Sequence, residues 1–143
     1  MSSAVSSVIL GEIVHISKGK KPASISVDAI DNTYLPYILI EGFGGQYNQF
    51  TNDKSCRLVQ ESDIEIVWDG ERAGLVSKGH KGYLGSTLAS VSVTNDAFDS
   101  NFIFYILQEK QKYLRQGAEG TGVPHLSRWV VENVSTCNLP LPE

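Results

Sequence analysis

Apolar residues in this 143-residue chain come in short runs. The longest are Leu35–Ile40 and Phe102–Leu107, whereas a helix that crosses a bilayer needs about 20 apolar residues. Hydrophobic residues nevertheless make up 41% of the sequence, which is too large a fraction for a disordered chain. The sequence therefore predicts a soluble globular protein that is built from short elements and makes no membrane contact.

The length of the chain corresponds to one domain, since domains most often contain about 100–150 residues. We expect residues 1–143 to form a single domain, with residues 1–8 as a disordered tail. The N-terminal segment lacks the basic residues of a secretory signal. The two cysteines, Cys56 and Cys137, lie far apart and indicate reduced thiols rather than a disulfide framework. These features predict a cytoplasmic protein.

The spacing of apolar, glycine and capping residues predicts an α+β fold with a twisted, β-rich core. Asp99 or Ser100 is expected to cap a longer helix, and a turn at Asp69-Gly70 is expected to close a hairpin. The predicted helices are a short N-terminal helix over Leu10–Lys18, the longer helix over residues 99–116, and a short C-terminal helix over Ser127–Asn133. The predicted strands are Leu35–Ile40, Arg57–Val59, Ile64–Trp68, Leu75–Ser77, Thr87–Val93 and Val134–Leu139.

No pattern of residues indicates a catalytic, metal or cofactor site. The glycine-rich segment Gly79–Thr87 has no lysine directly before its hydroxyl residues, which a phosphate-binding P-loop requires. The histidines and cysteines never fall at the spacing of metal ligands. We therefore expect no cofactor, no metal and no small-molecule substrate.

Four carboxylates surround the predicted hairpin end: Asp63, Glu65, Asp69 and Glu71. Carboxylates at a turn are commonly solvated, and nothing near them in the sequence indicates a raised pKa. A small hydrolase or nuclease is an alternative that rests on this cluster alone.

Basic and amide-bearing side chains are gathered in the predicted loops, as in a recognition module. Lysine and arginine pair with guanine or phosphates, and asparagine and glutamine pair with adenine. The chain has 12 Lys and Arg against 16 Asp and Glu, and the net charge of −4 argues mildly against nucleic acid. The Lys and Arg residues are unevenly distributed along the sequence, which still allows a local basic face on the folded protein. The candidate DNA-contacting residues are Lys18, Lys20, Lys21, Gln46, Tyr47, Asn48, Gln49, Arg72, Lys78, His80 and Lys81.

Several motifs, in this order along residues 10–142, resemble the target recognition domain of type I restriction–modification specificity (S, HsdS) subunits. These motifs are Leu10–Ile13 with Gly19-Lys20; Leu35–Ile38; Asp63–Gly70 with Gly74, Gly82 and Gly85–Thr87; and Tyr105 and Leu107 with Gly120–Ser127 and Leu139–Pro142. The resemblance implies a non-catalytic domain that recognises part of a bipartite site in double-stranded DNA. It also implies docking on methyltransferase (M) and restriction (R) subunits.

The resemblance divides the chain into scaffold and contact segments. The shared motifs, including Gly120–Ser127, are expected to be structural, whereas Gln46–Asn52 and Lys78–Lys81 between them are expected to contact bases. A complete specificity subunit has two such domains, each followed by a long helix, and this sequence stops where that helix would begin. We therefore expect an excised domain or a natural orphan. A protein-interaction module of the same fold that has lost DNA binding is the alternative, which the acidic net charge favours.

Overall fold

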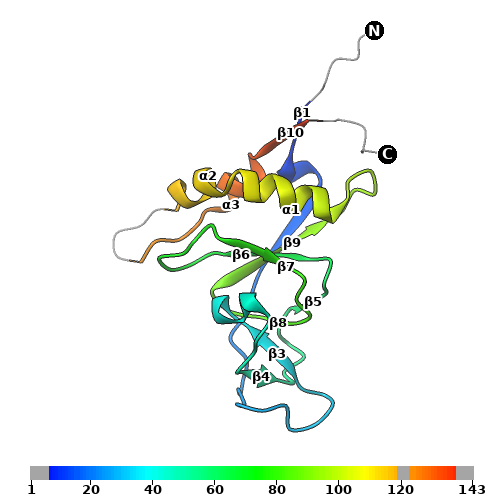
Figure 1. Ribbon diagram of the computed structural model, residues 1–143, viewed down its shortest axis with the longest axis vertical. Coiled ribbons are helices and arrows are strands. Elements are labelled where there is room, and N and C mark those ends of the chain that lie inside the picture. The colour runs from blue at the N-terminus through cyan, green and yellow to red at the C-terminus, as the bar shows by residue number, and fades with distance from the viewer. Residues whose placement is uncertain (1–6, 119–122, 138–143) are drawn as a thin grey trace.

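The computed structural model describes residues 7–118 and 123–137. The molecule is elongated: the helices lie at one end, a four-stranded sheet crosses the middle, and a second four-stranded sheet forms the distal end (Figure 1). The first and last described strands, β1 (Ser7–Ile9) and β10 (Ser135–Cys137), pair antiparallel at the helical end. The α+β fold that the sequence predicts is therefore confirmed.

The central sheet is antiparallel throughout. Its strands are, in spatial order, β2 (Val14–Lys18), β9 (Leu88–Val93), β6 (Ile64–Val67) and β7 (Val76–Lys78). The helices beside it are α1 (Ser100–Glu109), α2 (Gln111–Gln116) and α3 (Arg128–Glu132). Ile64, Ile66 and Val91 of the sheet are fully buried and belong to one cluster with Ile103 and Leu107 of α1. The main hydrophobic core therefore lies between the central sheet and the helices.

The distal sheet is mixed, because two of its strands, β3 and β8, run parallel. Its strands are, in spatial order, β4 (Phe50–Thr51), β3 (Leu35–Ile38), β8 (Gly82–Leu84) and β5 (Leu58–Val59), and a 3-10 helix, η2 (Ile40–Gly44), follows β3. A second core cluster joins Ile38, Val59 and Leu84 of the distal sheet to Val67 and Leu88 of the central sheet. This cluster covers the second face of the central sheet, and β6 is buried along its whole length.

The predicted strands are present, most of them in shorter form, and β6 and β7 form the predicted hairpin. Residues 68–75 connect the two strands, instead of a tight turn at Asp69-Gly70. The Gly70 N–H donates to the Pro124 carbonyl (2.8 Å), and the Leu126 N–H donates to the Trp68 carbonyl (2.7 Å). The described part of Gly120–Ser127, residues 123–127, thus supports this connection through its backbone. Residues 119–122, like residues 138 and 139 of the last predicted strand, lie outside the described residues.

The predicted N-terminal helix over Leu10–Lys18 is wrong. Only Leu10–Glu12 forms a helical turn, the 3-10 helix η1, and the chain then continues as β2. β-Branched residues favour a strand, and Val14 and Ile16 lie opposite Val93 and Val91 of β9. Residues 7 and 8, which were expected in a disordered tail, belong to β1, whereas residues 1–6 lie outside the described part.

The longer helix predicted over residues 99–116 is divided into α1 and α2. Lys110 between them has a ψ of 13°, which is outside the helical range. Directly after this residue, the Gln111 side chain donates to the Gly74 carbonyl and accepts from the Val76 N–H (3.3 Å). The division places Gln111 against the connection between β6 and β7, and such a tertiary contact is not visible in helical periodicity.

Asp99 caps α1, as the sequence predicts: its carboxylate accepts a hydrogen bond from the Asn101 N–H (3.2 Å). Replacement of such a capping residue by alanine costs about 1 kcal/mol. We therefore expect Asp99→Ala to lower the free energy of unfolding by about that amount in urea titrations. Asp96→Ala is the matched control, because Asp96 is exposed and carries the same charge. Equal effects of the two substitutions would contradict the capping role.

Candidate nucleic-acid interface

The two segments that the sequence singles out for base contact lie against each other. Residues 45–49 connect η2 to β4, and residues 79–81 connect β7 to β8. The Tyr47 hydroxyl lies 2.7 Å from His80 Nδ1, and the rings of Phe43 and His80 are stacked with centroids 5.7 Å apart. We call residues 45–49 and 79–81 the loop pair. Segments more than thirty residues apart therefore form one surface.

His80 is inside this surface rather than on it. Its side chain is only 4% exposed, and its second ring nitrogen, Nε2, lies 2.8 Å from Ser77 Oγ. Burial lowers the pKa of the imidazole, so the ring is neutral at neutral pH. His80, which was expected to contact bases, lies below the surface in contact with Tyr47 and Ser77. Tyr47 is half-buried.

The exposed residues of the loop pair carry the functional groups expected of base and phosphate contacts. Gln46 and Asn48 flank Tyr47 and are exposed, and Lys81 follows His80 and is also exposed. Within the described residues, no hydrogen bond or ion pair engages these three side chains. Gln49 and Lys78 are half-buried at the edges of the same surface. The loop pair thus presents amide and ammonium groups that are available to a ligand.

The other candidate residues lie elsewhere, and two of them are engaged. Lys18 forms an ion pair with Asp69 (2.8 Å) and donates to the Ser86 carbonyl (2.7 Å). Lys20 donates to Ser55 Oγ (2.8 Å). Lys21 and Arg72 are exposed. No hydrogen bond or ion pair within the described part of the chain joins any of these four residues to the loop pair, so contacts of this kind connect only one part of the predicted site.

Glu65 overturns the expectation that the carboxylates near the hairpin are solvated. Its side chain is 0% exposed, and neither carboxyl oxygen has a hydrogen-bond partner within the described residues. The pKa of Glu65 is raised to about 9, mainly by burial and also by the charge of Asp63, while the charge of Lys78 opposes the shift. Glu65 is therefore protonated at neutral pH. In the pairing of β6 with β7, Glu65 lies opposite Ser77, and the Ser77 hydroxyl contacts His80.

The burial of Glu65 could not be predicted because apolar and polar residues alternate at Ile64–Ile66, as they do in a strand with one solvent-exposed face. Ile64 and Ile66 face the core beside the helices. Because successive side chains of a strand point to opposite faces, the pattern predicts that Glu65 faces solvent. Val67, on the same face as Glu65, belongs instead to the cluster formed with the distal sheet. The signal that could have indicated burial is the unbroken run of apolar neighbours around one carboxylate.

The four carboxylates do not converge into an acid–base site. Asp63 accepts from Ser92 Oγ (2.8 Å) and from the Gln60 N–H (2.9 Å), Asp69 is paired with Lys18, and Glu71 is exposed. Among residues 7–118 and 123–137, no group of three or more His, Cys, Asp or Glu side chains is placed to hold a metal ion. The geometry therefore gives the hydrolase alternative no support.

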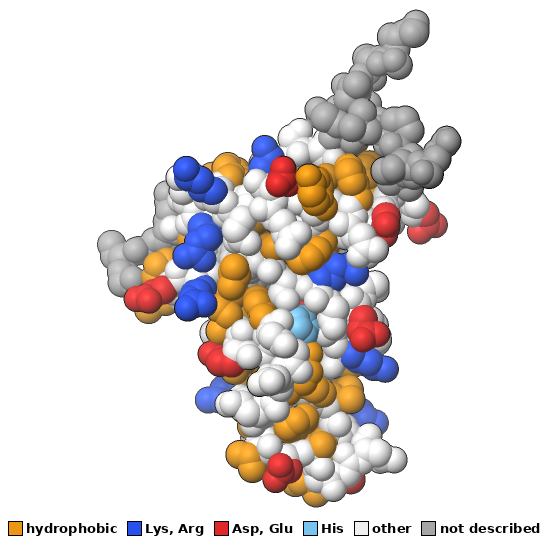
Figure 2. Space-filling model, in the orientation of Figure 1, with side chains coloured by type: hydrophobic (Ala, Val, Ile, Leu, Met, Phe, Trp, Pro, Cys, Tyr) orange, Lys and Arg blue, Asp and Glu red, His pale blue; other side chains and the backbone are white. Residues whose placement is uncertain are grey.

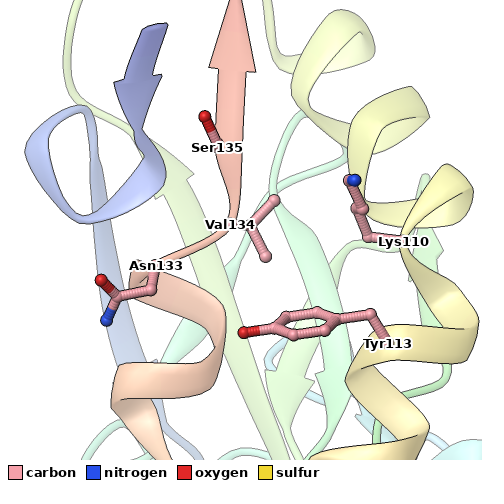
Figure 3. A pocket seen from close by; sticks show the side chains of 5 residues that line it. All are labelled: Lys110, Tyr113, Asn133, Val134 and Ser135. Carbon is pink, nitrogen blue, oxygen red and sulfur yellow. The ribbon is translucent and has the colours of Figure 1, made fainter.

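A cavity of about 250 Å³ lies at the helical end, away from the loop pair. Figure 3 shows its lining: Lys110 and Tyr113 come from the α1–α2 segment, and Asn133, Val134 and Ser135 follow α3, with the Tyr113 ring directed toward Asn133. This lining holds no group of convergent titratable side chains, so it does not suggest catalysis.

On the face visible in Figure 2, several Lys and Arg side chains gather along one side of the helical end, and basic and acidic side chains are interspersed on the rest of this face. The net charge of the chain is −4. In the described part of the chain, no helix has the length and apolar character that would be needed to cross a membrane.

The described residues form a β-rich scaffold on which polar loops are exposed. The model of the type I restriction modification DNA specificity domain matches residues 3–143, and the chain belongs to this family. The resemblance noted in the sequence is therefore confirmed. The specificity subunit of the type I restriction enzyme MjaVIII from Methanocaldococcus jannaschii is 35% identical over 139 residues, which cover 94% of this chain and 31% of that subunit.

Solved structures show the same fold. The S subunit of a type I restriction–modification system from M. genitalium superposes with a TM-score of 0.70 at 14% identity, covering 94% of this chain and 35% of that subunit. The HsdS subunit from Thermoanaerobacter tengcongensis gives a TM-score of 0.71 at 18% identity, covering 98% of this chain and 34% of that subunit. The chain thus spans about a third of the length of these relatives.

Proposed function

We propose that this chain is a single, non-catalytic DNA target recognition domain of a type I restriction–modification specificity subunit, which contacts part of a bipartite target. Membership of the specificity-domain family supports the class of function. The loop pair is the observation that supports the location of the DNA contact, because two distant segments meet there and present exposed amide and ammonium groups.

The chemistry of the loop pair suits base recognition. Asparagine and glutamine form two hydrogen bonds with adenine in the major groove, and lysine pairs with guanine or with a phosphate. Gln46 and Asn48 are two positions apart and both exposed, while Tyr47 between them is anchored to His80. We propose that Gln46 and Asn48 contact base edges and that Lys81 contacts a phosphate.

We further propose that the domain acts in the cytoplasm, together with methyltransferase and restriction subunits. Its relatives are named as specificity subunits of such systems, which supports this assignment. The helical end carries exposed aromatic side chains, with Trp129 61% and Tyr105 59% exposed. Aromatic residues are enriched in protein interfaces, so we propose the helical end as the side that contacts protein.

Selection from a randomised DNA duplex pool at low salt tests DNA recognition. We expect enrichment of one short motif, and we expect Gln46→Ala and Asn48→Ala to relax the preference at individual positions. Lys81→Ala is expected to weaken binding to all sequences alike and to reduce the salt dependence of log K by about one unit of slope. Lys112→Ala, at an exposed position of α2, is the matched control.

The outcomes of this selection separate the two classes of function. Binding without any enriched motif and without salt dependence would contradict DNA recognition. If, in addition, methyltransferase-like proteins copurify with the chain and Trp129→Ala abolishes this, the protein-interaction alternative is the better description.

A further inference from the structure

The loop pair has little backbone support of its own. Gly45 and Gln49 at the ends of the first loop are held by backbone hydrogen bonds, from the Gly45 N–H to the Gly42 carbonyl (2.9 Å) and from the Tyr37 N–H to the Gln49 carbonyl (2.8 Å). Within the described residues, Gln46–Asn48 and Gly79–Lys81 form no backbone–backbone hydrogen bonds. Gly45 and Gly79 stand at the start of the two loops with φ angles of 89° and 96°, a left-handed conformation that glycine adopts freely. The middle of the first loop and the whole of the second therefore depend on side-chain contacts for their position.

Side chains from two loops, a strand and a 3-10 helix meet at His80. Its Nδ1 atom contacts the Tyr47 hydroxyl (2.7 Å), its Nε2 atom contacts Ser77 Oγ of β7 (2.8 Å), and its ring lies between Phe43 of η2 and the edge of Tyr47. Both polar atoms of the ring are satisfied and the ring is buried. His80 thus connects the amide-bearing loop and the lysine-bearing loop to the central sheet.

Tyr47 and His80 are both uncharged at neutral pH, because the pKa of the Tyr47 phenol is raised and that of the His80 imidazole is lowered. Burial raises the pKa of Tyr47, so the phenol retains its proton at neutral pH. A neutral imidazole accepts at one nitrogen and donates at the other. The neutral ring of His80 therefore donates at one nitrogen and accepts at the other, and the Tyr47 and Ser77 hydroxyls take the complementary roles.

We propose that Tyr47 and His80 are positioning residues that hold the two loops as one DNA-contacting unit and thereby determine sequence discrimination rather than general affinity. This inference rests on the proposed function. It follows from the geometry because Gln46 and Asn48 flank one anchor, and Lys81 follows the other. Loss of the contact leaves the contacting groups present but no longer fixes the distance between the amides and the lysine.

Tyr47→Phe removes the hydroxyl and keeps the ring. One neutral hydrogen bond corresponds to about a three- to tenfold change in an equilibrium. We expect the ratio of affinities for the selected motif and for unrelated DNA to fall by about that factor, with affinity for unrelated DNA unchanged. Histidine ¹⁵N chemical shifts of the full chain should show a fixed neutral tautomer at His80, which becomes a mixture in Tyr47→Phe.

Tyr37→Phe is the matched control. The buried Tyr37 hydroxyl accepts from the Ser86 N–H (2.9 Å), so this substitution removes a comparable hydrogen bond outside the loop pair. It should change thermal stability without changing discrimination or the His80 signals. Ser77→Ala, which removes the partner of Nε2, should lower discrimination as Tyr47→Phe does.

The outcomes separate this inference from the function on which it rests. If the wild-type chain discriminates and Tyr47→Phe and Ser77→Ala discriminate equally well, the positioning role is overturned and the proposed function stands. If Tyr37→Phe lowers discrimination as much as Tyr47→Phe, general destabilisation is the cause and the positioning role is again overturned. If the wild-type chain shows no discrimination, the proposed function fails and the inference fails with it.

Discussion

Glu65→Gln is expected to stabilise the domain at neutral and alkaline pH and to remove most of the pH dependence of its stability between about pH 5 and 9. The side chain is fully buried and its pKa in the folded chain is about 9, compared with 4.5 for an ordinary glutamate. Glutamine keeps the shape of the protonated side chain and cannot ionise. The substitution therefore removes a cost that only the ionisable residue has.

The sign of this effect follows from proton binding. Above pH 4.5 the unfolded chain releases the Glu65 proton while the folded chain retains it. The stabilising contribution is complete below the unfolded pKa, and it is lost as pH rises toward the folded pKa, at a slope that approaches about 1.4 kcal/mol per pH unit. His80 acts in the opposite sense, since its lowered pKa reduces stability as pH falls below about 6.5.

Urea unfolding at pH 5, 7 and 9 measures the difference. We expect similar free energies of unfolding for the wild-type chain and Glu65→Gln at pH 5, and a gap of several kcal/mol in favour of the variant at pH 9. Glu71→Gln makes the same change of charge at an exposed position and should follow the wild-type curve. Parallel curves for wild type and Glu65→Gln would show that Glu65 is ionised in the folded chain.

Gly19→Ala is expected to prevent stable folding. A Cβ atom at this position would lie 1.9 Å from the carbonyl oxygen of Gly85 and 2.8 Å from that of Leu84. Both contacts are to backbone, and the Gly19 N–H also donates to the Leu88 carbonyl (2.9 Å), so no flexible side chain can move to make space. Such a clash costs more than about 3 kcal/mol, a large part of the stability of a small domain.

Thermal unfolding and soluble yield measure this second effect. Gly44→Ala is the matched control, because nothing lies within 4 Å of a Cβ atom at Gly44. We expect a loss of soluble folded protein for Gly19→Ala and a near-normal melting temperature for Gly44→Ala. A folded Gly19→Ala variant of ordinary stability would show that the contact between the end of β2 and the segment after β8 is loose.

Local patterns predicted the elements whose neighbours are close in sequence. Asp99 caps α1 through a residue two positions away, and the β6–β7 hairpin joins adjacent strands. The N-terminal segment was misassigned because the spacing of Leu10 and Ile13 suits one helical turn, whereas Val14 and Ile16 are held by β9, far along the chain. Local periodicity contains no information about that partner.

In the candidate site, too, features that depend on nearby residues could be predicted, and features that depend on residues far along the chain could not. The amide-bearing and lysine-bearing segments were identifiable from composition, but their contact depends on Tyr47 and His80, which are thirty-three positions apart. The burial of Glu65 depends on the distal sheet, whose strands come from both sides of β6 in the sequence. The segments of the loop pair could therefore be predicted from the sequence, whereas the contact between Tyr47 and His80 and the burial of Glu65 could not.

The pairing of β1 with β10 brings the two ends of the described fold together. Ser7 lies opposite Cys137, so the chain enters and leaves the described fold at neighbouring points, at the end opposite the distal sheet. A domain whose two chain ends lie side by side can be exchanged for another domain of the same fold without moving apart the segments to which those ends are joined.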